Sequence, residues 1–290
     1  MNNSTAVQRI PFTKMHGLGN DFVVLDTISN PVELSPAQVQ QLGDRKRGIG
    51  FDQLLIIGPP RRPDADFSYR IFNTDGSEVE HCGNGARCFA RYVLQRGLIA
   101  RSPIRVQTMN RLLELHSHQN GLVTVDMGAP DFSPTSLPFD APVQQGTYTL
   151  SVPQHPGADT VTDVHFYAVS MGNPHIVITV SDCDTAPVAT LGPVMCSWAS
   201  FAQGVNVGFM QIIDRSNIRL RVFERGAGET EACGTGTCAA VVCGIRAGLL
   251  DNHVCALLNG GELQIEWQGD NSPVLMTGPA TTVYEGSLLL

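Results

Sequence analysis

The stretch CGNGARCFARYVLQRG at residues 82–97 is matched by CGTGTCAAVVCGIRAG at residues 233–248. Each begins with a Cys-Gly-x-Gly turn, continues as a helical segment and reaches a glycine fifteen residues after its cysteine. The offset is 233 − 82 = 151, and it recurs at 224 − 73 = 151 and 248 − 97 = 151. An internal repeat of this kind predicts two homologous halves.

The repeat continues upstream with a two-residue change of offset. Gly19-Asn20, followed by three apolar residues from Phe22, matches Gly172-Asn173, followed by three from Ile176 (173 − 20 = 153), and Gln53 corresponds to Asn206 (206 − 53 = 153). Because the order of the matched segments is the same in both halves, we expect two domains. The first comprises residues 1–128 and 279–290, and the second comprises residues 129–278.

Within each half, short β-rich runs alternate with Gly, Pro and Asn turns. Ser35-Pro36 predicts a helix start with proline at the first position. After Cys82 the apolar residues follow a helical spacing that directs Arg87 and Arg91 outward, whereas the helix after Cys233 is apolar all round and therefore buried. We expect an α+β fold of two pseudo-symmetric domains, each a mainly antiparallel sheet wrapped around a central helix. The absence of a regular βαβ alternation disfavours a Rossmann fold.

Composition narrows the class of protein. The chain has 290 residues, 42% of them hydrophobic, and a net charge of −8, which are values typical of a soluble globular protein. The negative charge argues against nucleic acid as a partner, and no apolar run is long enough to span a bilayer. Residues 1–11 lack the basic and apolar regions of a signal peptide. We expect a cytoplasmic protein without a membrane or nucleic-acid partner.

The eight cysteines include no Cys-x-x-Cys pair, which disfavours a zinc site, so no metal is expected. A reducing cytosol would keep them as free thiols. Lys14 and Lys46 are the only lysines, and pyridoxal phosphate needs a Schiff-base lysine; the composition leans away from that cofactor. His81 stands beside Cys82, but its counterpart is Ala232, which favours a surface histidine over a catalytic one.

Cys82 and Cys233 are the candidate catalytic residues. A cysteine that opens a helix lies at the positive end of the helix dipole, which lowers its thiol pKa, and the free N–H groups of the turn can hold a carboxylate. Two such turns related by a pseudo-twofold favour proton transfer at one α-carbon. One thiolate would remove the proton, and the opposite thiol would return a proton to the other face. His175 and Glu224 are the groups expected to tune the thiols.

The most specific motifs are KMHGLGNDF at 14–22, GFDQ at 50–53, CGNGARC at 82–88 and ERGAGET at 224–230. Together with Cys233-Gly234-Thr235-Gly236 they strongly resemble the diaminopimelate epimerases, over residues 12–284. The resemblance implies interconversion of LL- and meso-2,6-diaminopimelate, in lysine and peptidoglycan-precursor synthesis, without pyridoxal phosphate or metal. It also implies a homodimer and a last strand that returns to the first domain.

The resemblance further assigns residues. It implies Cys82 and Cys233 as the acid/base pair and His175 and Glu224 as modulators of the thiol pKa. It implies contacts with the substrate from Asn20, Gln53, Asn73, Gly83, Asn84, Asn173, Asn206, Glu224, Arg225, Gly234 and Thr235, and a dimer contact from Tyr284. Thr235 stands where many relatives have serine, and both residues supply the same backbone N–H.

Two alternatives remain open at this point. A proline or hydroxyproline racemase would share the fold and the cysteine pair, but it would not need Arg225 and Glu224 to recognise the far end of the substrate. A non-catalytic thiol or metal-binding module would instead depend on neither Cys82 nor Cys233 for turnover.

Overall fold

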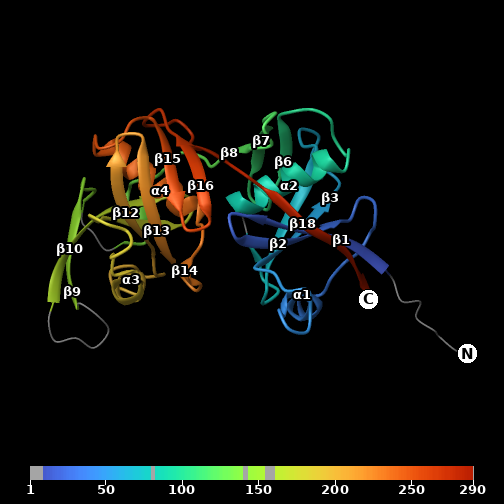
Figure 1. The fold of residues 1–290 in the computed structure, drawn as a ribbon, viewed down its shortest axis with the longest axis horizontal. Helices are drawn as coiled ribbons and strands as arrows, with labels where there is room; N and C mark the ends of the chain where they lie inside the picture. Colours follow the sequence, from blue (N-terminus) through green and yellow to red (C-terminus); the bar gives the residue numbers. More distant parts are fainter. Residues whose placement is uncertain (1–8, 80–81, 140–142, 154–160, 290) are drawn as a thin grey trace, which may run out of the picture. The chain divides into compact units, whose positions relative to one another are not determined.

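A computed structural model of the chain describes residues 9–79, 82–139, 143–153 and 161–289. His81 lies outside the described residues. The chain forms two compact units, Met1–Val125 with Pro279–Leu290 (unit 1) and Asp126–Gly278 (unit 2). The two units are coloured along the sequence in Figure 1 and are described in turn.

Unit 1 is a sheet that encloses the helix after Cys82, with a second, short helix outside it. The strand order is β18-β1-β2-β3-β4-β6-β7-β8, with the short β5 on β4. Its elements are β1 Arg9–Gly17, β2 Asn20–Asp26, α1 Pro36–Gly43, β3 Gln53–Gly58, β4 Phe67–Asn73, β5 Glu78–Val79, α2 Gly83–Gln95, β6 Ile104–Gln107, β7 Leu112–Ser117, β8 Val123–Asp126 and β18 Thr281–Leu289.

Unit 2 repeats this pattern with the order β9-β10-β11-β12-β13-β15-β16-β17, and β14 lies on β13. Its elements are η1 Pro134–Ser136, β9 Tyr148–Pro153, β10 Val161–Ser170, β11 Pro174–Thr179, α3 Val188–Cys196, β12 Asn206–Asp214, β13 Asn217–Glu224, β14 Gly228–Thr230, α4 Gly234–Arg246, β15 His253–Leu258, β16 Gly261–Glu266 and β17 Leu275–Gly278.

The sense of pairing is also the same in the two units. β2–β3 and β4–β6 are parallel, as are β11–β12 and β13–β15, and the other named pairings within each unit are antiparallel. This confirms the predicted α+β fold of two pseudo-symmetric, mainly antiparallel halves. The parallel pairs were not predicted. Each is joined by a crossover helix, because parallel neighbours need a long connection.

The helices α2 and α4 lie among the strands of their own units (Figure 1). Both end as predicted, at Gly97 with φ 65° and Gly248 with φ 72°, a left-handed conformation that glycine adopts without steric cost. α4 is buried on nearly every side, also as predicted. The prediction that Arg87 points outward was wrong, since its side chain is fully buried. Its guanidinium can be buried because it donates hydrogen bonds to Asn84 Oδ1 and Pro279 O inside the unit.

The predicted helix start at Ser35 is confirmed. The Ser35 hydroxyl accepts a hydrogen bond from the Gln38 N–H at 3.3 Å, and the Gln38 side chain accepts one from the Ser35 N–H at 2.9 Å. These two bonds form a capping box, with Pro36 in the first turn. The first turn of α1 is thereby fixed to the residue that precedes the helix.

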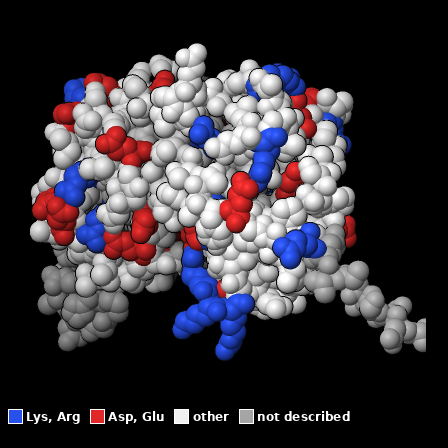
Figure 2. Space-filling view, turned by 45° about the vertical axis from the view of Figure 1, so that its right-hand side comes forward, with Lys and Arg blue, Asp and Glu red and all other residues white. Residues whose placement is uncertain are grey.

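The surface carries both charges. On the face in Figure 2, basic and acidic side chains are interspersed over much of the surface, and one compact group of basic side chains projects from it. In the part of the chain that the structure describes, no helix is long and apolar enough to cross a membrane. Within the same residues no three His, Cys, Asp or Glu side chains gather as a metal-binding group.

Candidate active site

The two candidate cysteines occupy the same position in their units. Cys82 is the N-cap of α2 and Cys233 is the N-cap of α4, both in extended conformation (φ −141°, ψ 114° and φ −112°, ψ 109°). Each backbone carbonyl accepts the first helical hydrogen bond, from Ala86 N and from Thr237 N, both at 2.9 Å. The N–H groups of the first turn therefore point toward the cysteine end of each helix.

The second glycine of each turn allows a close approach. A Cβ on Gly85 would lie 2.5 Å from the Tyr69 hydroxyl, and a Cβ on Gly236 would lie 3.2 Å from the Cys233 sulfur. The Tyr69 hydroxyl is buried and has no hydrogen-bond partner in the structure. Glycine lets each helix start against these groups, so the motif is required by packing as well as by chemistry.

Cys82 lies beside two of the predicted site residues. Its Sγ is 3.7 Å from Asn20 Oδ1, and the same oxygen accepts a hydrogen bond from Asn84 Nδ2 at 3.3 Å. Cys82 is half-buried, whereas Asn84 is buried. The amide oxygen of Asn20 therefore faces the thiol.

The amide of Asn20 is held from its other side. Asn20 Nδ2 donates to Asp52 Oδ2 at 3.1 Å, and a carboxylate can only accept. Asp52 also accepts from the Asp21 N–H at 3.0 Å and pairs with Arg45 at 2.7 Å. Asp21 pairs with Arg45 at 2.7 Å and with Lys14. Despite partial burial, these cations hold the pKa of Asp21 well below its ordinary value.

Gln53 and Asn73 form a second contact in unit 1. The two residues are opposite each other on β3 and β4, and Gln53 Nε2 donates to Asn73 Oδ1 at 3.0 Å. Asn73 Nδ2 is 3.4 Å from Ser77 Oγ. Gln53 is the first residue of β3 and Asn73 is the last residue of β4, so the two amides lie together beside the turn that carries Ser77.

Cys233 has a different environment. Its Sγ accepts a hydrogen bond from the Gly236 N–H at 3.3 Å and lies 3.6 Å from Thr235 Oγ1. Burial and the nearby Glu224 carboxylate raise the pKa of the Cys233 thiol well above its ordinary value, against the lowering effect of those two donors. The sequence predicted a lowered pKa from the helix position; the residue is only 5% exposed, and loss of solvation outweighs the dipole.

Glu224 is the last residue of β13 and lies near Cys233, and Arg225 follows it in the turn. Glu224 Oε1 accepts from Thr230 Oγ1 at 2.5 Å. Arg225 is exposed, and its Nη1 donates to Gln203 O at 2.6 Å. The Arg225 N–H donates to Asn206 Oδ1 at 2.9 Å, and Asn206 Nδ2 donates to Pro174 O at 3.2 Å. Asn206 thus holds the backbone around these charged groups.

His175 reaches Cys233 through two other side chains. His175 Nε2 is 2.9 Å from Asn173 Oδ1, Asn173 Nδ2 is 3.4 Å from Thr235 Oγ1, and Thr235 contacts the sulfur. Burial and the positive charge of Arg225 lower the pKa of His175 to about 3. His175 is therefore a neutral imidazole near pH 7, and it acts as a hydrogen-bonding group.

The pKa of His175 predicts a dependence of stability on pH. The unfolded histidine, with its ordinary pKa of 6.5, binds a proton below that pH, and the folded one does not until about pH 3. Unfolding then takes up a proton, so this contribution to stability is present above pH 6.5 and declines as the pH falls. At pH 5 it amounts to about 2 kcal/mol of lost unfolding free energy.

Urea denaturation of the wild type and His175→Gln at pH 7 and pH 5 measures this contribution. The variant should lose about 2 kcal/mol less than the wild type over that interval. The exposed His253 provides the matched control, His253→Gln. Equal losses in the wild type and His175→Gln would show that His175 titrates normally in the folded protein.

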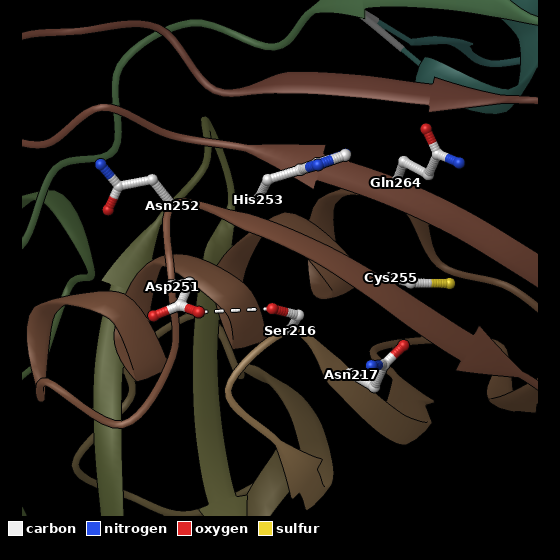
Figure 3. Close-up of a pocket in the computed structure, with 7 residues that line it drawn as sticks. All are labelled: Ser216, Asn217, Asp251, Asn252, His253, Cys255 and Gln264. Carbon is white, nitrogen blue, oxygen red and sulfur yellow. Dashed lines mark hydrogen bonds between the residues drawn. The ribbon is translucent and has the colours of Figure 1, made fainter.

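A pocket of about 520 Å³ lies elsewhere on unit 2 (Figure 3), lined by Ser216, Asn217, Asp251, Asn252, His253, Cys255 and Gln264. None of these is a predicted site residue. Burial and Glu262 raise the pKa of the Cys255 thiol, which disfavours a nucleophile. Within its lining, Ser216 Oγ already donates to Asp251 Oδ2 at 3.3 Å.

The structure thus forms two groups of predicted site residues, one in each unit. Cys82, Asn20 and Asn84 contact one another in unit 1, as do Gln53 and Asn73. In unit 2, Asn173, His175 and Thr235 connect to Cys233, Glu224 lies near the thiol, and Arg225 contacts Asn206. Tyr284 lies apart from these groups on β18, where it is 45% exposed and its ring meets Phe12 edge-on at 6.0 Å.

Two residues that support these groups were missed. Asp52 orients Asn20, and Arg87 orients Asn84 through a 2.9 Å hydrogen bond. Asp52 stands beside Gln53 in the GFDQ motif, which was a usable signal. For Arg87 the helical spacing predicted an outward side chain. The spacing could not show that one of its acceptors is the carbonyl of Pro279, 192 residues along the chain.

Solved structures share this architecture at low sequence identity. A hydroxyproline epimerase from Agrobacterium vitis has a TM-score of 0.69 and 14% identity, over 100% of this chain and 94% of that one. A phenazine biosynthesis protein of the PhzF family from Bacillus anthracis has a TM-score of 0.67 and 15% identity, over 98% and 100%. The fold of this chain is therefore one that a hydroxyproline epimerase also has.

The sequence comparisons identify the family. The diaminopimelate epimerase family model matches residues 12–133 and 167–283. A diaminopimelate epimerase from Ectopseudomonas mendocina is 54% identical, covering 96% of this chain and 99% of the relative. One from Chromobacterium violaceum is 53% identical, over 97% and 100%. This chain belongs to the diaminopimelate epimerase family.

Proposed function

We propose that this chain interconverts LL- and meso-2,6-diaminopimelate, as an isomerase of lysine and peptidoglycan-precursor synthesis that needs no pyridoxal phosphate or metal. The observation that carries the proposal is the identity of 53–54% over nearly the whole chain with relatives named diaminopimelate epimerase. The cysteine caps of α2 and α4 are consistent with this chemistry. The substrate is a small amino acid with a second amino-acid group at its far end.

Cys82 and Cys233 carry the proton transfer in this proposal. The thiolate of one cysteine removes the α-proton and becomes a thiol, leaving the electron pair on the α-carbon and its carboxylate. The thiol of the other cysteine then donates its proton to the opposite face and becomes a thiolate. The two cysteines exchange roles for the reverse reaction, so the enzyme returns to its first state after a turnover in each direction.

The helix N-termini hold the reacting carboxylate. The backbone N–H groups of Gly83 and Asn84 open α2, and those of Gly234 and Thr235 open α4. Such groups stabilise negative charge, and they favour the transition state most because the charge is greatest there. Each preorganised donor contributes about 10²–10³ to the rate.

The remaining polar residues bind the rest of the substrate. They are Asn20, Gln53, Asn73, Asn173, Asn206, Glu224 and Arg225. A guanidinium fork for a carboxylate and a carboxylate for an ammonium group can select the configuration of the distal centre. The exposed Arg225 and the half-buried Glu224 supply these two charges. His175 and Glu224 also modulate the thiols: Glu224 favours the protonated form of Cys233, and neutral His175 fixes Asn173.

We assign the functional domains as residues 1–128 with 279–290 and residues 129–278. The enzyme works in the cytoplasm as a homodimer with Tyr284 at the contact. The outer strand β18 supports this assembly, because it presents Val283, Tyr284 and Leu289, which are 55%, 45% and 64% exposed. An outer strand with exposed apolar side chains is suited to contact with a partner.

Activity with three substrates tests the function. The purified chain should interconvert LL- and meso-diaminopimelate, and it should leave L-proline and trans-4-hydroxy-L-proline unchanged, because these lack the distal ammonium and carboxylate. Chiral chromatography of each reaction measures both outcomes. Preferential turnover of either proline compound would establish the racemase alternative. No turnover, with zinc bound near one per chain, would favour the thiol or metal-binding module.

A further inference from the structure

The guanidinium of Arg87 is buried in unit 1 directly behind the α2 N-terminus. Arg87 is fully buried, and its Nη2 donates to Asn84 Oδ1 at 2.9 Å. Its Nε donates to Pro279 O at 3.1 Å, the first residue of the segment that returns to unit 1. A buried charge is costly unless it is hydrogen-bonded, so a sequence that retains one here points to a specific task.

Arg87 fixes which way the Asn84 amide points. A guanidinium only donates, so the oxygen of Asn84 must face it and the nitrogen faces Asn20. Asn84 Nδ2 donates to Asn20 Oδ1 at 3.3 Å, and this oxygen lies 3.7 Å from the Cys82 sulfur. A continuous path of contacts therefore leads from the Arg87 charge to the thiol.

The second half of the repeat has no such cation. The position equivalent to Arg87 is Cys238 (87 + 151 = 238), which is fully buried. Thr235 stands at the position of Asn84 (84 + 151 = 235). Asn173, which corresponds to Asn20, is supported by His175 at 2.9 Å. In the first half Arg87 thus reaches Asn20 through Asn84, whereas in the second half a neutral imidazole contacts the corresponding Asn173 directly.

We propose that Arg87 is a positioning residue for Cys82: it orients Asn84 and, through Asn84, Asn20, and its charge favours the thiolate of Cys82 but not that of Cys233. The inference rests on the proposed function, because it assigns Arg87 a part in the same proton transfer. Arg87 does not touch the reacting atoms. It acts through two amides that the proposed substrate would also contact.

Gly17 provides the space for this arrangement. A Cβ on Gly17 would lie 3.1 Å from Arg87 Nη2 and 3.3 Å from the Asn84 Cβ. A methyl group there would push on both members of the contact without removing the charge. Gly17→Ala is therefore an independent way to disturb the same path.

Arg87→Met and Arg87→Lys test the proposal in the full-length protein. Alkylation of Cys82 and Cys233 by iodoacetamide is followed from pH 6 to 10, each cysteine being resolved by mass spectrometry. Arg87→Met should raise the pH midpoint of Cys82 alkylation, because a nearby cation favours the thiolate, and Arg87→Lys should restore most of the shift. The Cys233 midpoint should not move. The kcat of Arg87→Met should fall by about 10²-fold, as for a misplaced catalytic group.

Arg91→Met is the matched control, since Arg91 is half-buried one turn further along α2; it should keep the wild-type kcat and both midpoints. If Arg87→Met does not fold, Gly17→Ala replaces it and should lower kcat while leaving the Cys233 midpoint unchanged. A wild-type Cys82 midpoint in Arg87→Met, or equal shifts at both cysteines, overturns the proposal. Alkylation needs no substrate, so it tests Arg87 even if the proposed epimerisation fails.

Discussion

Alanine or serine in place of either Cys82 or Cys233 should abolish epimerisation. Each cysteine is the acid in one direction and the base in the other, so no variant with a single thiol can complete a turnover. A positioned acid or base contributes about 10²–10⁴ to the rate, and kcat should fall by at least that factor in each variant. Serine is nearly isosteric, but its hydroxyl does not ionise near neutral pH, so it tests the proton transfer without removing the packing.

Solvent deuterium separates the two half-reactions. In D₂O a variant with one remaining thiol can still remove an α-proton and return a deuteron to the same face. Each single variant should therefore exchange the α-proton of one stereoisomer only, without inversion, and the two variants should differ in which isomer exchanges. Mass spectrometry and chiral chromatography measure exchange and inversion on the same samples.

Cys255→Ala is the control for loss of a thiol. Cys255 is half-buried on β15 and is not one of the predicted site residues, so its variant should keep wild-type kcat and exchange. Wild-type epimerisation in both Cys82→Ala and Cys233→Ala would disprove the two-base mechanism.

The features that the sequence predicted are local or repeated. The Cys-Gly-x-Gly turns, the helices that follow them and the closing glycines Gly97 and Gly248 depend on neighbours within fifteen residues. The repeat also predicted the sheets, because segments that occur in the same order in both halves should form the same arrangement of strands in each. This is why the fold could be predicted although its parallel pairs could not: a crossover leaves little trace in the hydrophobic pattern of short strands.

The features that could not be predicted depend on contacts between distant residues. Arg87 is buried because the Pro279 carbonyl reaches it from 192 positions away, which no spacing on α2 reveals. The helix position of Cys233 correctly indicates donors around the sulfur, yet the pKa is raised because the enclosing sheet and Glu224 act more strongly. Electrostatics at a helix N-terminus follow from local sequence, whereas desolvation follows from the whole fold.

The two halves also differ in the direction of their hydrogen bonds. Asn20 turns its oxygen toward Cys82, whereas Asn173 turns its nitrogen toward Thr235, next to Cys233. An oxygen beside sulfur favours the protonated thiol, and a donor chain favours the thiolate. The Arg87 charge opposes the first effect and Glu224 opposes the second. At Cys233 burial and Glu224 outweigh the donors, and the pKa stays well above its ordinary value.

Gly48→Ala should cause the largest loss of stability, because its methyl group would meet backbone rather than flexible side chains. A Cβ on Gly48 would lie 2.3 Å from Gln41 O and 2.5 Å from Leu42 O. These carbonyls end α1, and the Leu42 carbonyl accepts hydrogen bonds from Ile49 N at 2.9 Å and Gly50 N at 3.0 Å. The turn must open, at a cost of about 3 kcal/mol in unfolding free energy.

The same change should impair function through Asn20. The turn carries Arg45, which pairs with Asp52, and Asp52 holds the Asn20 amide beside Cys82. We expect the apparent melting temperature to fall by about 6–12 °C and kcat to fall even at temperatures where the variant is folded. Gly146→Ala is the matched control, since an added Cβ meets nothing within 4 Å; calorimetry should find it unchanged. A Gly48→Ala protein that melts and turns over like the wild type would show that the turn between α1 and β3 adapts freely and does not set the position of Asn20.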